Sequence, residues 1–155
     1  MKPYADTNFF TRVYLELPGS AAADRLLETA RTGEAEPVPI TWLHRMELVN
    51  AFELSVWLGR QGGHPSISPQ QAATALATFM EDLNAKAFLR PIRPDPAALE
   101  SLFEETALRH TAKHGFRTYD LLHVASACLL GCDAFFSFDQ RARKLARLEG
   151  MAVAD

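Results

Sequence analysis

The chain has 155 residues, which is enough for one domain with a sizeable hydrophobic core, and we expect residues 1–155 to form a single domain. Hydrophobic residues make up 48% and charged residues 23%, without repeats or low-complexity tracts, which excludes a disordered or fibrous protein. No apolar run reaches the roughly 18 residues that cross a bilayer, and Asp6 comes too early for a signal peptide, so we expect a cytoplasmic protein with no membrane span.

The first half of the chain alternates short apolar segments with helical patterns. We expect a first strand to end at Tyr4-Ala5, followed by one helix from Thr7 to Leu17 and another from Ser20 to about Arg31. Val38 to Ile40 is expected to form a weak strand, because it contains prolines, and a long helix is expected from Thr41 to about Gly59.

The second half repeats the alternation after a Gly-rich loop at Gln61 to Ser68. The expected elements are a helix from Ser68-Pro69, a strand Phe88 to Ile92, a helix from Asp95 to a terminator at Gly115, a helix to Leu130 opened by Thr118 or Asp120, a strand Ala134 to Phe138, a helix Asp139 to Leu148 and a strand Met151 to Val153. Alternating strands and helices predict an α/β fold with a parallel sheet. In such sheets the functional site lies beyond the carboxyl ends of the strands.

Four acidic residues lie in otherwise apolar stretches: Asp6, Glu47, Asp120 and Asp139. A carboxylate in an apolar setting is costly unless it is paired, hydrogen-bonded or bound to a metal. Four carboxylates brought together would repel one another, and a divalent cation removes that repulsion. Oxygen ligands of this kind suit Mg²⁺ or Mn²⁺, and such a site is typical of enzymes that hydrolyse phosphodiester bonds.

Each acid also has a purely structural interpretation. Asp6, Asp120 and Asp139 stand where helices are expected to begin, so each could serve as an N-cap. Glu47 lies inside a predicted helix, beyond the first turn, where its alternative role is an exposed polar stripe with Arg45 or Asn50. The residues after Asp120 are mostly apolar and leave little polar surface, so Glu47 and Asp120 are the most informative of the four.

Basic residues concentrate in the last third of the chain, although the whole protein has a net charge of −3. Seven Lys or Arg and three Asp between Arg109 and Arg147 leave that stretch with a charge of +4. We expect this basic rim to bind a polyanion such as RNA, or alternatively to be the solvated face of the last helix. The candidate RNA-binding residues are Arg117, Arg141, Arg143 and Lys144.

The acidic motifs resemble those of a known family. They are Asp6-Thr7-Asn8, Glu47 in Met46-Glu47-Leu48-Val49-Asn50-Ala51, Asp120 in Asp120-Leu121-Leu122-His123-Val124-Ala125-Ser126-Ala127, and Ser137-Phe138-Asp139. In this order and over almost the whole chain they are similar to PIN-domain ribonucleases, with the VapC-like toxins of bacterial type II toxin–antitoxin modules as the nearest branch. The loop from Gln61 to Ser68 is longer than that family leads us to expect.

The resemblance implies a three-layer α/β/α fold whose sheet has about four to five strands in the order 3-2-1-4-5. It implies that Asp6, Glu47, Asp120 and Asp139 are catalytic and bind one or two Mg²⁺ or Mn²⁺ ions. Thr7, Asn8 and Ser137 would then support the site. The resemblance also implies hydrolysis of RNA, a homodimer and inhibition by a small cognate antitoxin protein.

His123 follows Asp120 by three residues, on the same face of the helix. It is expected either to support the site through a contact with a ligand residue or to be a packed or surface histidine. Two other functions have to be weighed. The first is a PIN-like regulatory module that binds RNA or protein without catalysis. The second is a phosphatase-like hydrolase with Asp6 as nucleophile, which would need a second aspartate at position 8, where the chain has Asn8.

Overall fold

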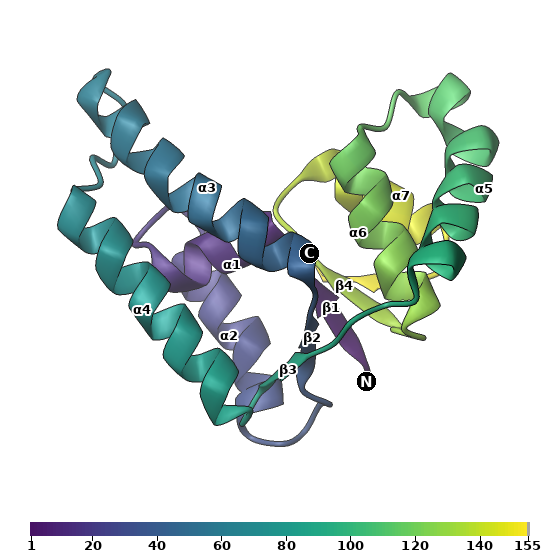
Figure 1. The fold of residues 1–155 in the computed structure, drawn as a ribbon, viewed down its shortest axis with the longest axis horizontal. Helices are drawn as coiled ribbons and strands as arrows, with labels where there is room; N and C mark the ends of the chain where they lie inside the picture. The colour runs from purple at the N-terminus through teal and green to yellow at the C-terminus, as the bar shows by residue number, and fades with distance from the viewer. Residues whose placement is uncertain (155) are drawn as a thin grey trace.

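The computed structural model describes residues 1–154, in which five short strands alternate with seven helices (Figure 1). The strands are β1 (Pro3–Ala5), β2 (Val38–Ile40), β3 (Leu89–Pro91), β4 (Ala134–Phe136) and β5 (Ala152–Val153). The helices are α1 (Thr7–Tyr14), α2 (Ser20–Arg31), α3 (Trp42–Arg60), α4 (Pro69–Ala85), α5 (Pro96–His114), α6 (Thr118–Leu129) and α7 (Gln140–Leu148). This alternation confirms the predicted α/β class.

Each ladder is parallel and the strands lie in the order 3-2-1-4-5, but the single sheet of four to five strands that the resemblance implies is divided into two sheets. β1 pairs with β4 and β4 with β5, while β2 pairs with β3 in a separate ladder. β2 packs beside β1 without a ladder. Val38 donates its N–H to Phe88 on the β3 side, so Pro39 faces β1 and has no N–H to donate there.

Strand residues alternate between two buried cores, which places helices on both faces of the strands. Ala5 and Phe136 belong to the core beneath α1 to α4, whereas Tyr4 and Phe135 belong to the core beneath α6 and α7. The three-layer α/β/α arrangement expected from the sequence is thereby confirmed.

Several element boundaries differ from the expected ones. α1 ends at Tyr14 rather than Leu17, because Leu15 already has extended backbone angles. α6 begins at Thr118, so Asp120 is not its N-cap but sits at its third position. β3 is shorter than predicted, at Leu89–Pro91, whereas the helix stop at Gly115 is confirmed, with a left-handed φ of 68° that suits glycine.

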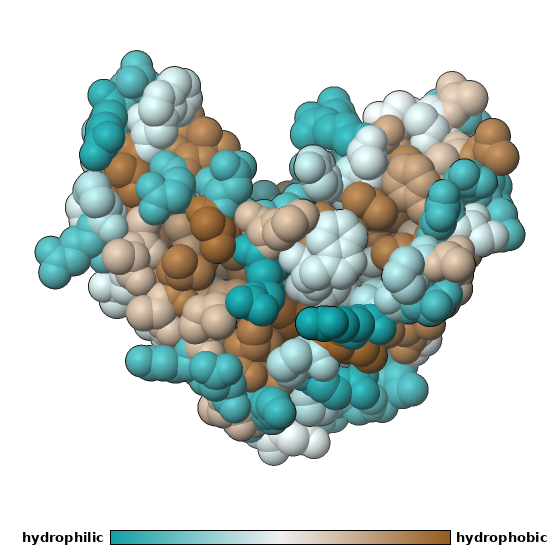
Figure 2. Space-filling view, viewed as in Figure 1, coloured by the Kyte–Doolittle hydropathy of each residue, from teal (hydrophilic) through white to brown (hydrophobic). Residues whose placement is uncertain are grey.

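The Gln61–Ser68 loop closes an antiparallel hairpin of α3 and α4, which projects from the strands opposite α5 and α6 (Figure 1). Between these two helical groups the surface is hollowed (Figure 2). Among residues 1–154, none of the helices combines the length and apolarity needed to span a membrane.

Candidate active site

The site forms where β1 and β4 end side by side. Asp6 comes directly after β1 and donates its N–H to the Phe136 carbonyl of β4 over 3.1 Å. Ser137 and Asp139 follow β4 at the same edge. Because the strands are parallel, Asp6 and Asp139 come to lie near one another, as the sequence predicted.

Glu47 and Asp120 reach this edge from helices on opposite faces of the strands. Glu47 is carried by α3 and Asp120 by α6. All four acids line a single cavity of about 210 Å³, together with Thr7, Asn8, Arg117, Tyr119, His123 and Ala142. The convergence expected of the four acids is therefore present in the folded chain.

Asp6 and Asp139 cap helices and line the cavity at the same time. Asp6 Oδ1 accepts a hydrogen bond from the Phe9 N–H of α1 over 2.9 Å. Asp139 Oδ1 accepts from the N–H groups of Arg141 and Ala142 at the start of α7, over 2.7 and 3.3 Å. The capping interpretation is thus correct for both residues, but it uses only one oxygen of each carboxylate.

Glu47 has no capping role and is not part of an exposed stripe. Its Oε2 accepts a hydrogen bond from the Thr7 hydroxyl over 2.7 Å and lies 2.6 Å from His123 Nε2. Its side chain is only 23% exposed. A glutamate so placed inside α3 is held for the cavity rather than for solvent.

The fourth acid, Asp120, accepts a hydrogen bond from the residue that caps the start of its own helix. Its Oδ2 accepts from the Arg117 N–H over 3.1 Å. Among residues 1–154, no hydrogen bond engages Glu47 Oε1, Asp120 Oδ1 or Asp139 Oδ2. Three carboxylates of the cavity thus keep one oxygen each for a ligand.

Burial and mutual repulsion shift the acids in different directions. Burial raises the pKa of Asp6 to about 6, with a further rise from Asp139, against the opposing effects of His123, Ser137 and the Phe9 N–H. Burial also raises the pKa of Asp120. For Glu47, burial is outweighed by His123 and Thr7, and its pKa is lowered.

The predicted supporting residues contact the acids as expected from their positions. Ser137 donates its hydroxyl to Asp6 Oδ2 over 2.5 Å and accepts the Asp139 N–H over 2.9 Å, so it joins the two strand-end acids. Asn8 Oδ1 accepts a hydrogen bond from Arg12 over 2.9 Å, which orients the amide at the cavity wall.

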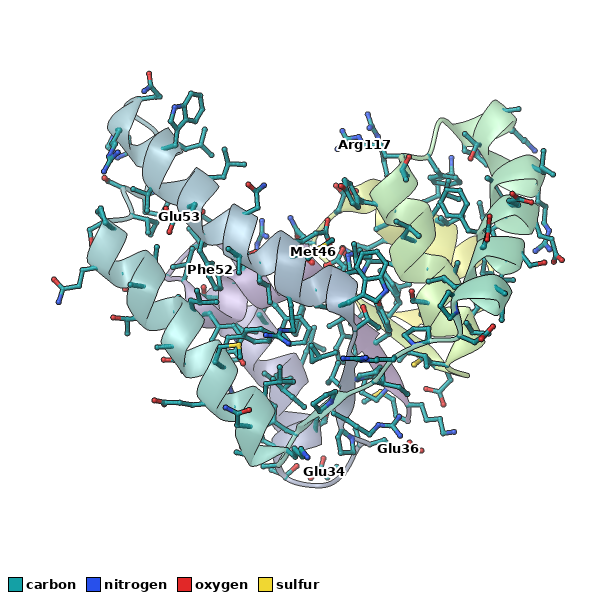
Figure 3. All side chains as sticks on the ribbon, in the orientation of Figure 1. Glu34, Glu36, Met46, Phe52, Glu53 and Arg117 are labelled. Atoms are coloured by element: carbon teal, nitrogen blue, oxygen red, sulfur yellow. The ribbon has the colours of Figure 1, made fainter. Side chains whose placement is uncertain are left out.

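The four predicted RNA-binding residues are not equally placed. Arg117 lines the cavity. In Figure 3 it lies on the side of α5 and α6, across the hollow from Met46 of α3. Arg141 is exposed at the start of α7, and its charge helps to stabilise the Asp120 carboxylate. Arg143 is half-buried and donates to the Ala154 carbonyl over 2.7 Å, and Lys144 is exposed near His114, so neither lines the cavity.

Tyr119 is a cavity residue that the sequence interpretation missed. It is 57% exposed and lines both the acidic cavity and an adjoining groove of about 490 Å³ along α3. The two depressions also share Thr7, Asn8 and Glu47. The only available signal was its position directly before Asp120, because exposure of an aromatic residue cannot be read from helical periodicity.

The donor set suits a hard divalent cation. Within residues 1–154, no three Asp, Glu, His or Cys residues are close enough to ligate one ion together. Mg²⁺ commonly binds to only one or two carboxylates and keeps several waters, so a fully closed cage is not required. The unengaged oxygens of Glu47, Asp120 and Asp139 therefore fit Mg²⁺ or Mn²⁺ by their chemistry, with at most two of these residues on any one ion.

A parallel α/β fold with a carboxylate-lined cavity at its strand ends is the architecture expected of a PIN domain. The model of the PIN domain family matches residues 4–148, and the chain belongs to this family. Among solved structures, the chain is similar to Mycobacterium tuberculosis VapC20, described as a toxin that cleaves the sarcin-ricin loop. The identity is 17% and the TM-score 0.63, over 99% of this chain and 100% of that one, which shows a shared fold. A search of the curated proteins found no match.

Proposed function

We propose that the protein is a metal-dependent endoribonuclease that hydrolyses RNA phosphodiester bonds. The observation that carries the proposal is the single cavity lined by Asp6, Glu47, Asp120 and Asp139. Membership of the PIN domain family supports the same class of activity. Three of the four acids sit on caps or helix starts, so the backbone fixes their positions before any ligand arrives.

The carboxylates of Asp6, Glu47, Asp120 and Asp139 would hold Mg²⁺ or Mn²⁺ in this proposal. Such an ion supplies a lowered pKa for water and stabilises the charge that develops on the phosphate. Ser137 keeps Asp6 oriented through its hydroxyl, and Thr7 does the same for Glu47. The residues thus provide a rigid, preorganised set of oxygen ligands.

Positively charged and aromatic groups at the rim would bind the RNA. Arg117 and Arg141 lie beside the carboxylates and can neutralise phosphates on either side of the cleaved bond. Tyr119, exposed where the cavity opens into the groove, offers a ring on which one base can stack. Arg143 and Lys144 would contribute only to the positive electrostatic potential around α7.

We further propose that the protein acts as the toxin of a toxin–antitoxin module in the cytoplasm, as a homodimer inhibited by a small cognate antitoxin. The fold shared with VapC20 supports this role. Exposed apolar side chains on α3, which are Trp42, Met46, Val49, Leu54, Trp57 and Leu58, offer surface for protein partners.

The test is cleavage of RNA by the purified protein with Mn²⁺ or Mg²⁺, compared with Asp6→Asn and Asp120→Asn. Both variants should lose activity, because each removes a negatively charged ligand at the site. A matched control is Asp95→Asn, which alters an N-cap on α5 outside the cavity and should remain active. Cleavage that persists in the two site variants would overturn the assignment.

A further inference from the structure

A buried chain of polar side chains runs behind Glu47 into the core. His123 Nε2 lies 2.6 Å from Glu47 Oε2, and His123 Nδ1 lies 3.0 Å from the Tyr4 hydroxyl. Tyr4 belongs to β1, His123 to α6 and Glu47 to α3. Three elements from all three layers of the fold therefore meet in a single row of hydrogen bonds.

The far end of this row is rigid. Tyr4 is fully buried and stacks on Phe135 of the neighbouring strand, with ring centroids 5.6 Å apart. His123 is only 4% exposed and lies edge-on to Tyr4. A phenol anchored in this way cannot move without disturbing the core, so it fixes the histidine ring that leans on it.

The hydrogen-bond directions assign the protons in this row. The Glu47 carboxylate only accepts hydrogen bonds, so a neutral His123 ring carries its proton on Nε2 and accepts the Tyr4 hydroxyl at Nδ1. The ring proton therefore points at Glu47. Thr7 donates to the same oxygen, Glu47 Oε2, and leaves Oε1 unengaged.

His44, the neighbouring histidine, shows what a purely structural role looks like. Its Nε2 donates to the Ala5 carbonyl over 2.7 Å, and its Nδ1 accepts from the Thr41 N–H over 3.0 Å. His44 thus secures the main chain at the end of β1 and at the start of α3, where the Thr41 hydroxyl also lies 3.0 Å from its Nδ1. The partners of His123 are instead all side chains: Tyr4 at Nδ1, and the cavity residues Glu47 and Thr7 at Nε2.

We infer that Tyr4 and His123 are positioning residues, which together hold the Glu47 carboxylate in one orientation and leave its Oε1 free for the ion and water of the reaction. This inference rests on the proposed nuclease function. Neither residue would touch the RNA, and both would act through Glu47. Removing a residue that hydrogen-bonds to a metal ligand typically lowers metal affinity or activity by about 10- to 100-fold.

The test uses Tyr4→Phe, His123→Leu and His123→Gln in the full-length chain. Tyr14→Phe is the control for the first, because it removes a partly buried tyrosine hydrogen bond to Asp82 outside the cavity. His110→Gln is the control for the histidine variants, since His110 makes a similar 2.6 Å contact with Glu149 away from the site. All variants are checked for cooperative thermal unfolding.

Two measurements read the geometry without relying on turnover. Long-range ¹H–¹⁵N spectra of the metal-free protein should show His123 with its proton on Nε2, and a shifted Nδ1 resonance in Tyr4→Phe, where the hydrogen bond to Nδ1 is lost. Mn²⁺ titration followed by electron paramagnetic resonance should show an affinity about 10-fold lower in Tyr4→Phe and about 100-fold lower in His123→Leu. His123→Gln keeps an N–H for Glu47 and should recover most of the loss.

In RNA cleavage, the same variants should lower kcat with little change in KM, while both controls match the wild type. If Tyr4→Phe and His123→Leu equal a wild type that binds Mn²⁺ and cleaves RNA, the inference is wrong and the proposed function stands. If the wild type neither binds Mn²⁺ nor cleaves RNA, the proposed function fails and the inference falls with it. Should His123→Leu not fold, Tyr4→Phe and His123→Gln decide the matter.

Discussion

At the scale of single residues, the carboxylates of the cavity have a structural task, to which the proposed function adds a chemical one. Asp6 and Asp139 each use one oxygen to cap a helix, and Asp120 uses one at the start of α6. From sequence alone these tasks cannot be separated, because both favour an acid at the start of a helix. Only the position of the remaining oxygens in one cavity distinguishes this set from ordinary caps.

Asp6 gives a pH dependence with a definite sign in the metal-free protein. Its folded-state pKa of about 6 exceeds the ordinary 3.8, so folding favours its protonated form. Its contribution to stability is full below pH ~4 and is lost as the pH rises through about 6. The loss amounts to at most ~3 kcal/mol, from 1.36 kcal/mol per pKa unit.

Urea unfolding of the wild type and Asp6→Asn between pH 4 and 8 measures this effect. The free energy of unfolding of the wild type should fall relative to that of the variant as the pH rises, and added Mn²⁺ should reverse the trend by favouring the ionised carboxylate. A constant difference between the two proteins across this range would contradict the burial of Asp6.

Tyr119 gives a second prediction at this scale. Removing its ring in Tyr119→Ala should weaken RNA binding by about 1–3 kcal/mol, the usual contribution of one stacked base. Tyr119→Phe keeps the ring and should bind as the wild type does. Fluorescence anisotropy with a labelled single-stranded RNA measures both, and equal weakening in the two variants would show that stacking is not the role of Tyr119.

At the scale of the elements, turn and cap chemistry was the most reliable guide. Helix α5 begins after Asp95 and ends at Gly115, as predicted. Helix α4 also begins at Ser68-Pro69 as predicted. The break between β1 and β2 could not be predicted, because it depends on which way Pro39 faces in a pairing between distant segments. The Tyr4–His123 contact joins residues 119 apart, a distance that periodicity cannot bridge.

The contact between α5 and α7 supplies a test that leaves the site alone. Glu149 is only 9% exposed and accepts from Arg109 over 2.9 Å and from His110 over 2.6 Å. Replacing it by Gln should lower the free energy of unfolding by about 1–3 kcal/mol, because charge-assisted hydrogen bonds are lost. Mn²⁺ affinity should not change. A drop in Mn²⁺ affinity would show that the cavity depends on this contact.

At the scale of the whole molecule, the site exists only when all three layers are assembled. The strand order brings Asp6 and Asp139 together, and helices on opposite faces add Glu47 and Asp120. An ion that binds this assembly and not the unfolded chain must stabilise the fold. At ten times its Kd, Mn²⁺ should add about 1.4 kcal/mol to the free energy of unfolding.

Differential scanning calorimetry with and without Mn²⁺ measures this stabilisation. The melting temperature should rise with the ion and return to its starting value with a chelator. Glu149→Gln should show the same rise from a lower starting point, whereas Asp120→Asn should show little. An unchanged wild-type melting temperature at millimolar Mn²⁺ would favour a binding module without catalysis.

Under the proposed function, these four carboxylates form one metal-dependent ribonuclease centre. This assignment is tested most directly by RNA cleavage under single-turnover conditions, first in a chelator and then with Mn²⁺ restored, for the wild type and Glu47→Gln. We expect no cleavage in the chelator, recovery with Mn²⁺, and a rate in Glu47→Gln lower by about 100-fold or more, typical of the loss of a charged catalytic group. Cleavage that survives chelation, or a Glu47→Gln rate equal to that of the wild type, would contradict the assignment.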